Sequence, residues 1–351
     1  MLVLLWLLLG IAGMNVSPQW SWVFGFLAFS TPVPLLLNLL FLLYWLARRS
    51  WMVVLPLLVV GGGWDYYHRG LSLNLADNRV PEQAARLEVL SFNVEVFNSY
   101  AHQHDSTYSS SINLINWVAQ HPADVLLLQE FYHEPGSEVY ATKNKIGEEQ
   151  GRELFVSPSL VNRVQAEFGL AIFSRYPILS HGQIPFGKLT FNHAIYADLQ
   201  VNADTIRVYN THLESMAIDG AGVVAAVKGE RVRSQGKDAF KRLRKGFLAR
   251  GEQVNLLLDH MASSPYPVLV GGDLNDIPWS YTYEQFNHRL TNAFQASGRG
   301  FGFTYNGKIP FLRIDNQFYS EGLRAHRITV HREMPYSDHF PVSVEYSISY
   351  E

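Results

Sequence analysis

The chain has 351 residues, of which 48% are hydrophobic, and it carries a formal net charge of −3. This balance gives no overall electrostatic attraction to nucleic acid or to anionic lipid. Because the chain contains no cysteine, disulfides and thiolate metal sites are excluded.

The first 64 residues are strongly apolar and contain only two charged side chains. The run 24–47 exceeds the roughly 20 apolar residues that a helix needs to cross a bilayer. The runs 2–13 and 51–64 are shorter and would need flanking residues to cross. A cleaved signal peptide is the alternative for the first run, but no basic residue precedes it. We therefore predict a transmembrane region over residues 1–64 with two to three helices.

The two charged residues of this region, Arg48 and Arg49, lie between the second and third apolar runs. Cationic loops tend to stay on the cytoplasmic side of a membrane. If all three runs cross, the chain from residue 65 onward emerges on the outer side. We therefore expect an integral protein of the cell membrane, with a polar linker over 65–84 and an extracytoplasmic remainder.

Beyond the linker, many segments have a strand pattern and few have a helical one. Helical spacing occurs over 111–120 and over 222–262, where Gly236, Gly246 and Gly251 leave open whether there are two helices. Strand patterns cover 86–96, 123–130, 168–175, 193–201, 205–213, 266–275, 313–320 and 341–349. Many strands with few intervening helices favour an α/β fold of two packed, mostly antiparallel β-sheets flanked by helices, a four-layer α/β/β/α sandwich.

Acidic, amide and imidazole side chains stand at or just after the ends of these strands. They are Asn93, Glu130, Asn210, His212, Asp273, Asn275, Asp315, Asp338 and His339. Each alone is also typical of a turn or a cap, but their recurrence at strand ends predicts one site at an edge of the sheets. Carboxylate and amide oxygens without thiolates suit Mg²⁺ or Mn²⁺. Such an ion polarises a phosphoryl oxygen while a carboxylate or imidazole deprotonates water, which indicates hydrolysis of a phosphate ester.

Six short motifs occur along the chain in the order SFNV, LQE, NTHL, GGDLND, RID and SDHFPV. Together they resemble the endonuclease/exonuclease/phosphatase family over roughly residues 86–348. That family includes deoxyribonuclease I, exonuclease III-type repair nucleases, neutral sphingomyelinases and inositol polyphosphate 5-phosphatases. With its histidine, the NTHL motif resembles that of the deoxyribonuclease I and sphingomyelinase members. The resemblance implies a catalytic domain over 85–351.

The resemblance also implies a role for each matched residue. It implies metal ligation by Glu130, Asn93 and Asp338. It implies catalytic roles for His212, Asp273, Asp315 and His339. It implies binding of the substrate phosphate by Asn93, Asn210, Asn275 and His339. Whether Asp273 or His339 deprotonates the attacking water stays open.

Lipid and nucleic acid phosphodiesters are the two substrate classes that fit. The basic segment 228–250 could contact nucleic acid, rest on anionic headgroups or form a solvated helix face. The glycine-rich stretch 298–311, with Phe301, Phe303 and Tyr305, is a candidate substrate-side loop. We expect a membrane-tethered phosphodiesterase that uses Mg²⁺ or Mn²⁺ and acts on a lipid headgroup or small phosphoester. The alternatives are an extracytoplasmic deoxyribonuclease-like nuclease and a non-catalytic binding module; no protein partner can be inferred.

Overall fold

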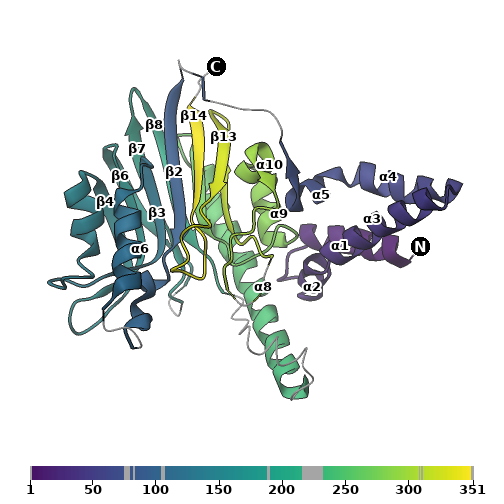
Figure 1. The fold of residues 1–351 in the computed structure, drawn as a ribbon, viewed down its shortest axis with the longest axis horizontal. Coiled ribbons are helices and arrows are strands. Elements are labelled where there is room, and N and C mark those ends of the chain that lie inside the picture. The colour runs from purple at the N-terminus through teal and green to yellow at the C-terminus, as the bar shows by residue number, and fades with distance from the viewer. Residues whose placement is uncertain are drawn as a thin grey trace.

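The computed structural model describes residues 2–74, 80–81, 84–103, 107–187, 190–215, 232–307, 309 and 311–348. Two six-stranded β-sheets pack face to face, with helices on their outer faces, and an N-terminal helical region projects to one side (Figure 1). The predicted α/β sandwich of two mostly antiparallel sheets is confirmed.

Each sheet contains one parallel pair of neighbouring strands among antiparallel ones. The first sheet has the order β13 (Leu323–Val330), β14 (Val342–Ile348), β2 (Ala85–Asn93), β3 (Val125–His133), β5 (Glu167–Ser174) and β4 (Glu153–Val161). The second has the order β10 (Thr291–Asn292), β12 (Asp315–Tyr319), β9 (Val268–Asp273), β8 (Asp204–His212), β7 (His193–Val201) and β6 (Ile178–Pro185). The parallel pairs are β2 with β3 and β8 with β9. A short antiparallel pair joins β1 (Ser72–Leu73) to β11 (Arg299–Gly300).

Apolar side chains form one core between the sheets and one on each outer face. In β2, Leu87 and Val89 lie in the core between the sheets, whereas Leu90 and Phe92 lie in the core under α6 (Ser109–Gln120). Because side chains alternate along a strand, both faces of β2 are buried. The outer face of the second sheet packs against α8 (Val232–Ala262) and α9 (Tyr281–Asn287). The smaller helices are α10 (Ala293–Ser297), η2 (Glu95–Gln103), η3 (Lys143–Gly147) and η4 (Glu148–Gln150).

The N-terminal region is helical throughout its apolar runs. Its elements are α1 (Leu2–Asn15), α2 (Val23–Phe29), α3 (Pro32–Ala47), η1 (Trp51–Val53) and α4 (Val54–Gly62). Ser30 and Thr31 keep helical backbone angles, so α2 and α3 continue into each other. In the described part of the chain, the stretch Val23–Ala47 is the one helix long and apolar enough to cross a membrane. The helices Leu2–Asn15 and Trp51–Gly62 are apolar but shorter.

The N-terminal helices pack against the sheet domain at several places, among them Asn15 of α1, whose Oδ1 atom lies 3.1 Å from Nε2 of His288 after α9. On α2 and α8, the rings of Phe26 and Phe240 stack with their centroids 4.7 Å apart. Helix α5 (Trp64–Gly70) carries Arg69, which is 2% exposed and forms an ion pair with Glu284 of α9. Arg313 donates a hydrogen bond to the carbonyl oxygen of Arg69 over 2.7 Å. Helix α5 and strand β1 thus occupy part of the stretch that we expected to be a linker.

Candidate active site

The strand arrangement explains why polar residues far apart in sequence meet at one edge. The carboxyl ends of β2, β3, β8 and β9 lie at the same edge because each parallel pair runs in one direction. The antiparallel strand β12 begins there with Asp315, which pairs with Asp273, the last residue of β9. His339 lies just before β14, the antiparallel neighbour of β2. Two parallel pairs and two antiparallel strand starts therefore converge on one place.

Most of the candidate residues line a single cleft of about 310 Å³. Those in its wall are Asn93, Glu130, His212, Asp273, Asn275, Asp338 and His339. The cleft wall also includes apolar side chains such as Phe168 and Leu312. These candidate residues thus form one concave surface, although they come from five separate segments.

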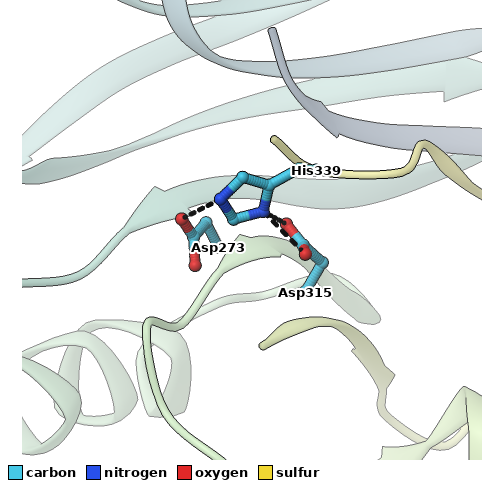
Figure 2. Close-up of side chains that lie close together, drawn as sticks. All are labelled: Asp273, Asp315 and His339. Carbon is cyan, nitrogen blue, oxygen red and sulfur yellow. Dashed lines mark hydrogen bonds and ion pairs between the residues drawn. The ribbon is translucent and has the colours of Figure 1, made fainter. Parts of the chain in front are cut away.

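His339 lies between two buried carboxylates (Figure 2). Its Nδ1 atom is 3.0 and 2.9 Å from the two carboxylate oxygens of Asp315. Its Nε2 atom is 3.6 Å from Oδ2 of Asp273. Asp315 is not part of the cleft wall; it contacts His339 from behind. The arrangement fixes the imidazole ring and leaves Nε2 toward Asp273.

The Asp273 carboxylate is the meeting point of the catalytic candidates. Its Oδ1 atom accepts a hydrogen bond from the backbone N–H of Asn275 over 2.8 Å. Its Oδ2 atom accepts hydrogen bonds from the side-chain amides of Asn93 and Asn275, each over 3.2 Å. The Nε2 atom of His212 is 3.6 Å from the same oxygen. Burial with so many donors gives this carboxylate one fixed orientation.

Backbone conformation brings Asp273 and Glu130 into place. At Gly272, φ is +152°, and a Cβ atom would lie 1.9 Å from the carbonyl oxygen of Thr211. Only glycine fits here, so β9 can approach β8 closely just before Asp273. Glu130 has φ of +50° and lies within an irregularity of β3 between Leu128 and Phe131. Such an irregularity redirects a side chain relative to the regular alternation of a strand.

Charge interactions shift the pKa values of the central residues. Burial alone would lower the pKa of His339, but the neighbouring carboxylates Asp315 and Asp273 outweigh it and hold that pKa well above its usual value. Burial also raises the pKa of Asp273, against the opposing effect of His339. Burial raises the pKa of Asp338 to about 6, and His339 again opposes the shift. The centre therefore favours a protonated imidazole beside carboxyl groups that accept protons readily.

Two residues outside the six motifs, Glu95 and Tyr305, also contact the site. Glu95 accepts a hydrogen bond from the backbone N–H of Asp338 over 2.9 Å, and burial raises its pKa. It follows Asn93 by two positions in SFNVEV, where a strand predicted to continue to residue 96 concealed it. Tyr305, in the predicted substrate-side loop, lies 5.4 Å from His339 between ring centroids. Phe301 and Phe303 of that loop stack on each other at 5.3 Å and are not in the cleft wall.

Asn210, like Asp315, lies outside the cleft wall, but its side chain bonds strands of the other sheet. Its side-chain amide donates to the carbonyl oxygens of Leu128 and Ala171, over 2.8 and 2.9 Å. Its Oδ1 atom accepts a hydrogen bond from Gln129 over 2.6 Å. Asn210 lies on β8, and its three partners lie on strands of the other sheet. It therefore ties the two sheets together beneath the cleft floor.

Two groups of side chains have ligand atoms suited to a divalent cation. Asp273, Asp315 and His339 place such atoms within 4.8 Å of one another, but both oxygens of Asp315 already contact Nδ1 of His339. The side chains of Glu130 and Asp338 line the cleft and are 28% and 41% exposed. Their carboxylates provide the oxygen ligands that Mg²⁺ and Mn²⁺ prefer, and their exposure leaves room for water ligands. The amide of Asn93 donates to Glu130 over 3.3 Å, and its oxygen accepts from the backbone N–H of Glu95 over 3.1 Å. The second group therefore fits a metal better than the buried first group.

The comparison with protein families gives two matches. The family described as "Endonuclease/Exonuclease/phosphatase family" matches residues 90–339. The family "Domain of unknown function (DUF8431)" matches residues 1–70. No curated protein sequence is similar enough to match the chain.

Solved structures with similar folds include proteins of that first family. An endonuclease/exonuclease/phosphatase family protein from Bacteroides thetaiotaomicron has a TM-score of 0.56 at 16% identity, covering 77% of this chain and 100% of its own. The human Nocturnin catalytic domain has a TM-score of 0.51 at 17% identity, covering 76% and 94%. D. rerio TDP2 complexed with single strand DNA product has a TM-score of 0.52 at 15% identity, covering 75% and 99%. At these identities the likeness concerns the fold.

Proposed function

The chain belongs to the endonuclease/exonuclease/phosphatase family, and we propose that it is a membrane-tethered phosphodiesterase that depends on Mg²⁺ or Mn²⁺. Members of the family are generally hydrolytic phosphoesterases or nucleases. The observation that carries the proposal is the buried pair of His339 and Asp315 beside Asp273, whose carboxylate is hydrogen-bonded to Asn93, which in turn donates to Glu130 in the same cleft. Asp273 can accept a proton, and the protonated His339 can bind phosphoryl oxygens. Glu130 and its neighbours can bind a metal.

We assign proton transfer to Asp273. A protonated imidazole has no free lone pair, and the raised pKa of His339 keeps it protonated. The raised pKa of Asp273 makes its carboxylate a better acceptor for the proton of the attacking water. The water oxygen bonds to phosphorus as the bond to the leaving oxygen breaks, and the water proton moves to Asp273.

The remaining residues bind and stabilise. The His339 cation would hold the phosphoryl oxygens, and His212 would stabilise the leaving oxygen. The amide of Asn275 donates to Leu213 and Asp273, so it would bind a phosphoryl oxygen only by giving up one of these bonds. Glu130, Asn93 and Asp338 would hold the metal, which when bound supplies Lewis-acid polarisation of the phosphoryl group. In this proposal Asn210 has a structural role between the sheets and no longer a phosphate-binding one.

The side chains of the cleft favour a lipid headgroup or a small phosphoester over a polynucleotide. Among the described residues in the cleft wall there is no Lys or Arg. Proteins that track a nucleic acid backbone contact its phosphates with such cations. A nuclease is nevertheless the second candidate, because the similar fold of TDP2 was solved with a single strand DNA product.

The membrane tether rests on the N-terminal helices. The stretch Val23–Ala47 is long and apolar enough to cross a membrane, and large apolar side chains of α1, α3 and α4 are exposed, among them Leu2, Leu43 and Leu58. Arg48 and Arg49 follow α3 at the end far from the sheet domain (Figure 1). With these cations on the cytoplasmic side, the sheet domain would be extracytoplasmic.

The activity is tested with the full chain in detergent or lipid nanodiscs. We expect Mg²⁺-dependent hydrolysis of phosphatidylcholine, sphingomyelin or bis-p-nitrophenyl phosphate, and much weaker cleavage of plasmid DNA. Asp273→Asn and His339→Ala should abolish turnover, whereas Asp204→Asn, at the opposite end of β8, should not. Equal turnover in all four proteins, or none on any substrate, would overturn the proposal. Preferred cleavage of DNA would select the nuclease.

The orientation is tested by cysteine labelling, because the chain has no cysteine of its own. Single substitutions Ser50→Cys, next to Arg49, and Glu149→Cys, exposed on the sheet domain, are treated with an impermeant maleimide in intact cells. We expect Glu149→Cys to react in intact cells and Ser50→Cys to react after permeabilisation. The reverse pattern would place the sheet domain in the cytoplasm.

A further inference from the structure

A second pocket, of about 500 Å³, lies beside the active-site cleft. The two share the walls formed by Phe168 and Phe191. A turn over residues 95–98, in which every residue has positive φ, lies between them. It carries Glu95, which bonds Asp338 on the cleft side, and Val96, which lines the second pocket. Consecutive left-handed residues are costly and concentrate at functional sites.

The second pocket has aromatic walls. Tyrosines 100, 108, 132 and 140 line it. The ring of Tyr140 lies edge-on to those of Tyr108 and Tyr132, with centroids 6.2 and 5.4 Å apart. The Tyr140 hydroxyl lies 3.0 Å from Oγ of Ser111. Tyr100 stands at the rim and is 66% exposed. The hydrogen bond and the ring packing keep the aromatic walls in place.

The charge of this pocket identifies the kind of group that it suits. Among its described lining residues, Glu134 is the one charged side chain. The hydroxyl of Tyr132 donates to the Glu134 carboxylate over 3.0 Å, which places the negative charge next to an aromatic ring. Aromatic faces and a carboxylate both attract a cation, and several tyrosines around an acid are the arrangement that binds quaternary ammonium groups. An anionic group, such as the next phosphate of a polynucleotide, is repelled here.

We propose that the pocket formed by Tyr100, Tyr108, Tyr132, Tyr140 and Glu134 binds a quaternary ammonium group on the substrate. The inference rests on the proposed function, because the adjacent cleft must hold the phosphate to which the cation is attached. Phe168 and Phe191 line both binding places, which puts the two next to each other. A phosphodiester of the choline type, with its cation a few bonds from phosphorus, joins both requirements in one small headgroup.

The test compares two esters with the same p-nitrophenol leaving group. p-Nitrophenyl phosphorylcholine carries the cation, and ethyl p-nitrophenyl phosphate lacks it. With the full chain in nanodiscs, we expect kcat/KM to be about tenfold higher for the choline ester. Glu134→Gln and Tyr132→Leu should each reduce that ratio to near one, and Glu138→Gln, an exposed acid on the same loop, should leave it unchanged. A wild-type ratio near one, or a ratio unchanged in both pocket variants, overturns the inference.

Two further measurements separate this inference from the proposed function. Thymidine 5′-(p-nitrophenyl phosphate) tests whether the pocket binds a nucleobase. A higher kcat/KM for this ester than for the choline ester, lost in Tyr132→Leu and kept in Glu134→Gln, would contradict the proposed cation site. It would assign a nucleobase to the pocket instead. If no ester is hydrolysed, the proposed activity is wrong. Calorimetry then tests ligand binding to the pocket independently of catalysis. Choline phosphate should bind the Asp273→Asn protein about tenfold more tightly than ethyl phosphate, and Glu134→Gln in that background should remove the difference. Equal binding of the two compounds overturns the inference.

Discussion

The Nδ1 atom of His339 contacts both carboxylate oxygens of Asp315, at 3.0 and 2.9 Å. Asp315 is 2% exposed and has no surface in the cleft. It therefore acts on a substrate only through the ring that it holds, as a positioning residue. Its negative charge also helps to keep His339 protonated.

Replacing Asp315 with Asn should reduce kcat by on the order of 10³-fold, because the ring loses its charged partner. The double variant Asp315→Asn/His339→Ala should be no slower than His339→Ala alone, since the two residues act as a unit. Removing the Asp315 charge lowers the pKa of His339 toward its usual value. Residual activity of Asp315→Asn should therefore rise as the pH falls, if the cation is the working form. A residual activity that rises with pH would make His339 the proton acceptor instead.

Replacing Glu130 with Gln should weaken the response to metal. The substitution keeps the shape of the side chain and removes the charge of a proposed metal ligand. We expect the Mg²⁺ concentration for half-maximal activity to rise on the order of 100-fold, with EDTA abolishing activity in the wild-type chain and added Mg²⁺ restoring it. The exposed Glu149→Gln is the matched control. An unchanged Mg²⁺ dependence in Glu130→Gln would remove Glu130 from the metal site.

Replacing Gly272 with Ala should destabilise the chain by at least about 3 kcal/mol. The added Cβ would meet the carbonyl oxygen of Thr211 at 1.9 Å, and backbone cannot yield as a flexible side chain does. Gly136 also has positive φ, of +77°, but nothing lies within 4 Å of its added Cβ. Gly136→Ala should therefore cost only about 1 kcal/mol from backbone strain. Urea unfolding of both variants tests the difference, and similar midpoints would contradict the proposed clash.

Because His121 is buried, the free energy of unfolding should decrease as the pH falls. Burial, with help from His331 and Arg152, lowers the pKa of His121 to about 4 from its usual 6.5. Its Nδ1 atom accepts a hydrogen bond from the backbone N–H of Ala123 over 3.2 Å, which requires a deprotonated nitrogen. Between pH 6.5 and 4 the unfolded chain binds this proton and the folded chain does not. The stabilisation is therefore complete above about pH 6.5 and is lost as the pH falls.

The matched variant for this prediction is His121→Asn, which keeps an acceptor near the position of Nδ1 and cannot titrate. As the pH falls from 7 to 4, the free energy of unfolding of the wild-type chain should decrease relative to this variant by up to about 3 kcal/mol. Titrating groups that do not interact with His121 cancel in the difference. A difference that stays constant across this range would refute the assignment to His121.

The central strands could be predicted from the sequence, and the edge strands could not. The apolar patterns around β2, β3, β8 and β9 identified strands because both of their faces are buried. We did not predict β4, β6 and β13, which all lie at sheet edges. Pro158 in β4, Gly182 in β6 and the cations of β13 break the apolar alternation. Edge strands tolerate such residues because one side of each lacks a strand partner.

The site itself was predictable to the extent that its residues stand at strand ends. Asp273 and His339 could be predicted because they belong to motifs at strand ends. In the structure, Nε2 of His339 lies 3.6 Å from Oδ2 of Asp273. Burial separates Asn210 from them, because its side chain on β8 points to the other sheet. Alternation along a strand decides that direction, and the motif NTHL alone does not reveal which face is the cleft. Glu95 was hidden for a related reason, since the left-handed turn that redirects it has no glycine to mark it.

The hydrogen bond from Arg313 to the carbonyl oxygen of Arg69 has a mechanical consequence. Arg69 is the penultimate residue of α5, the last N-terminal helix, and Arg313 precedes by two residues the aspartate that holds His339. With the ion pair to Glu284 and the stacked rings of Phe26 and Phe240, this hydrogen bond joins the apolar helices to the domain that carries the cleft at three places in the described part of the chain. If those helices span a bilayer, a change in their tilt turns the cleft by the same angle. Bilayer thickness would then set the direction from which a substrate arrives.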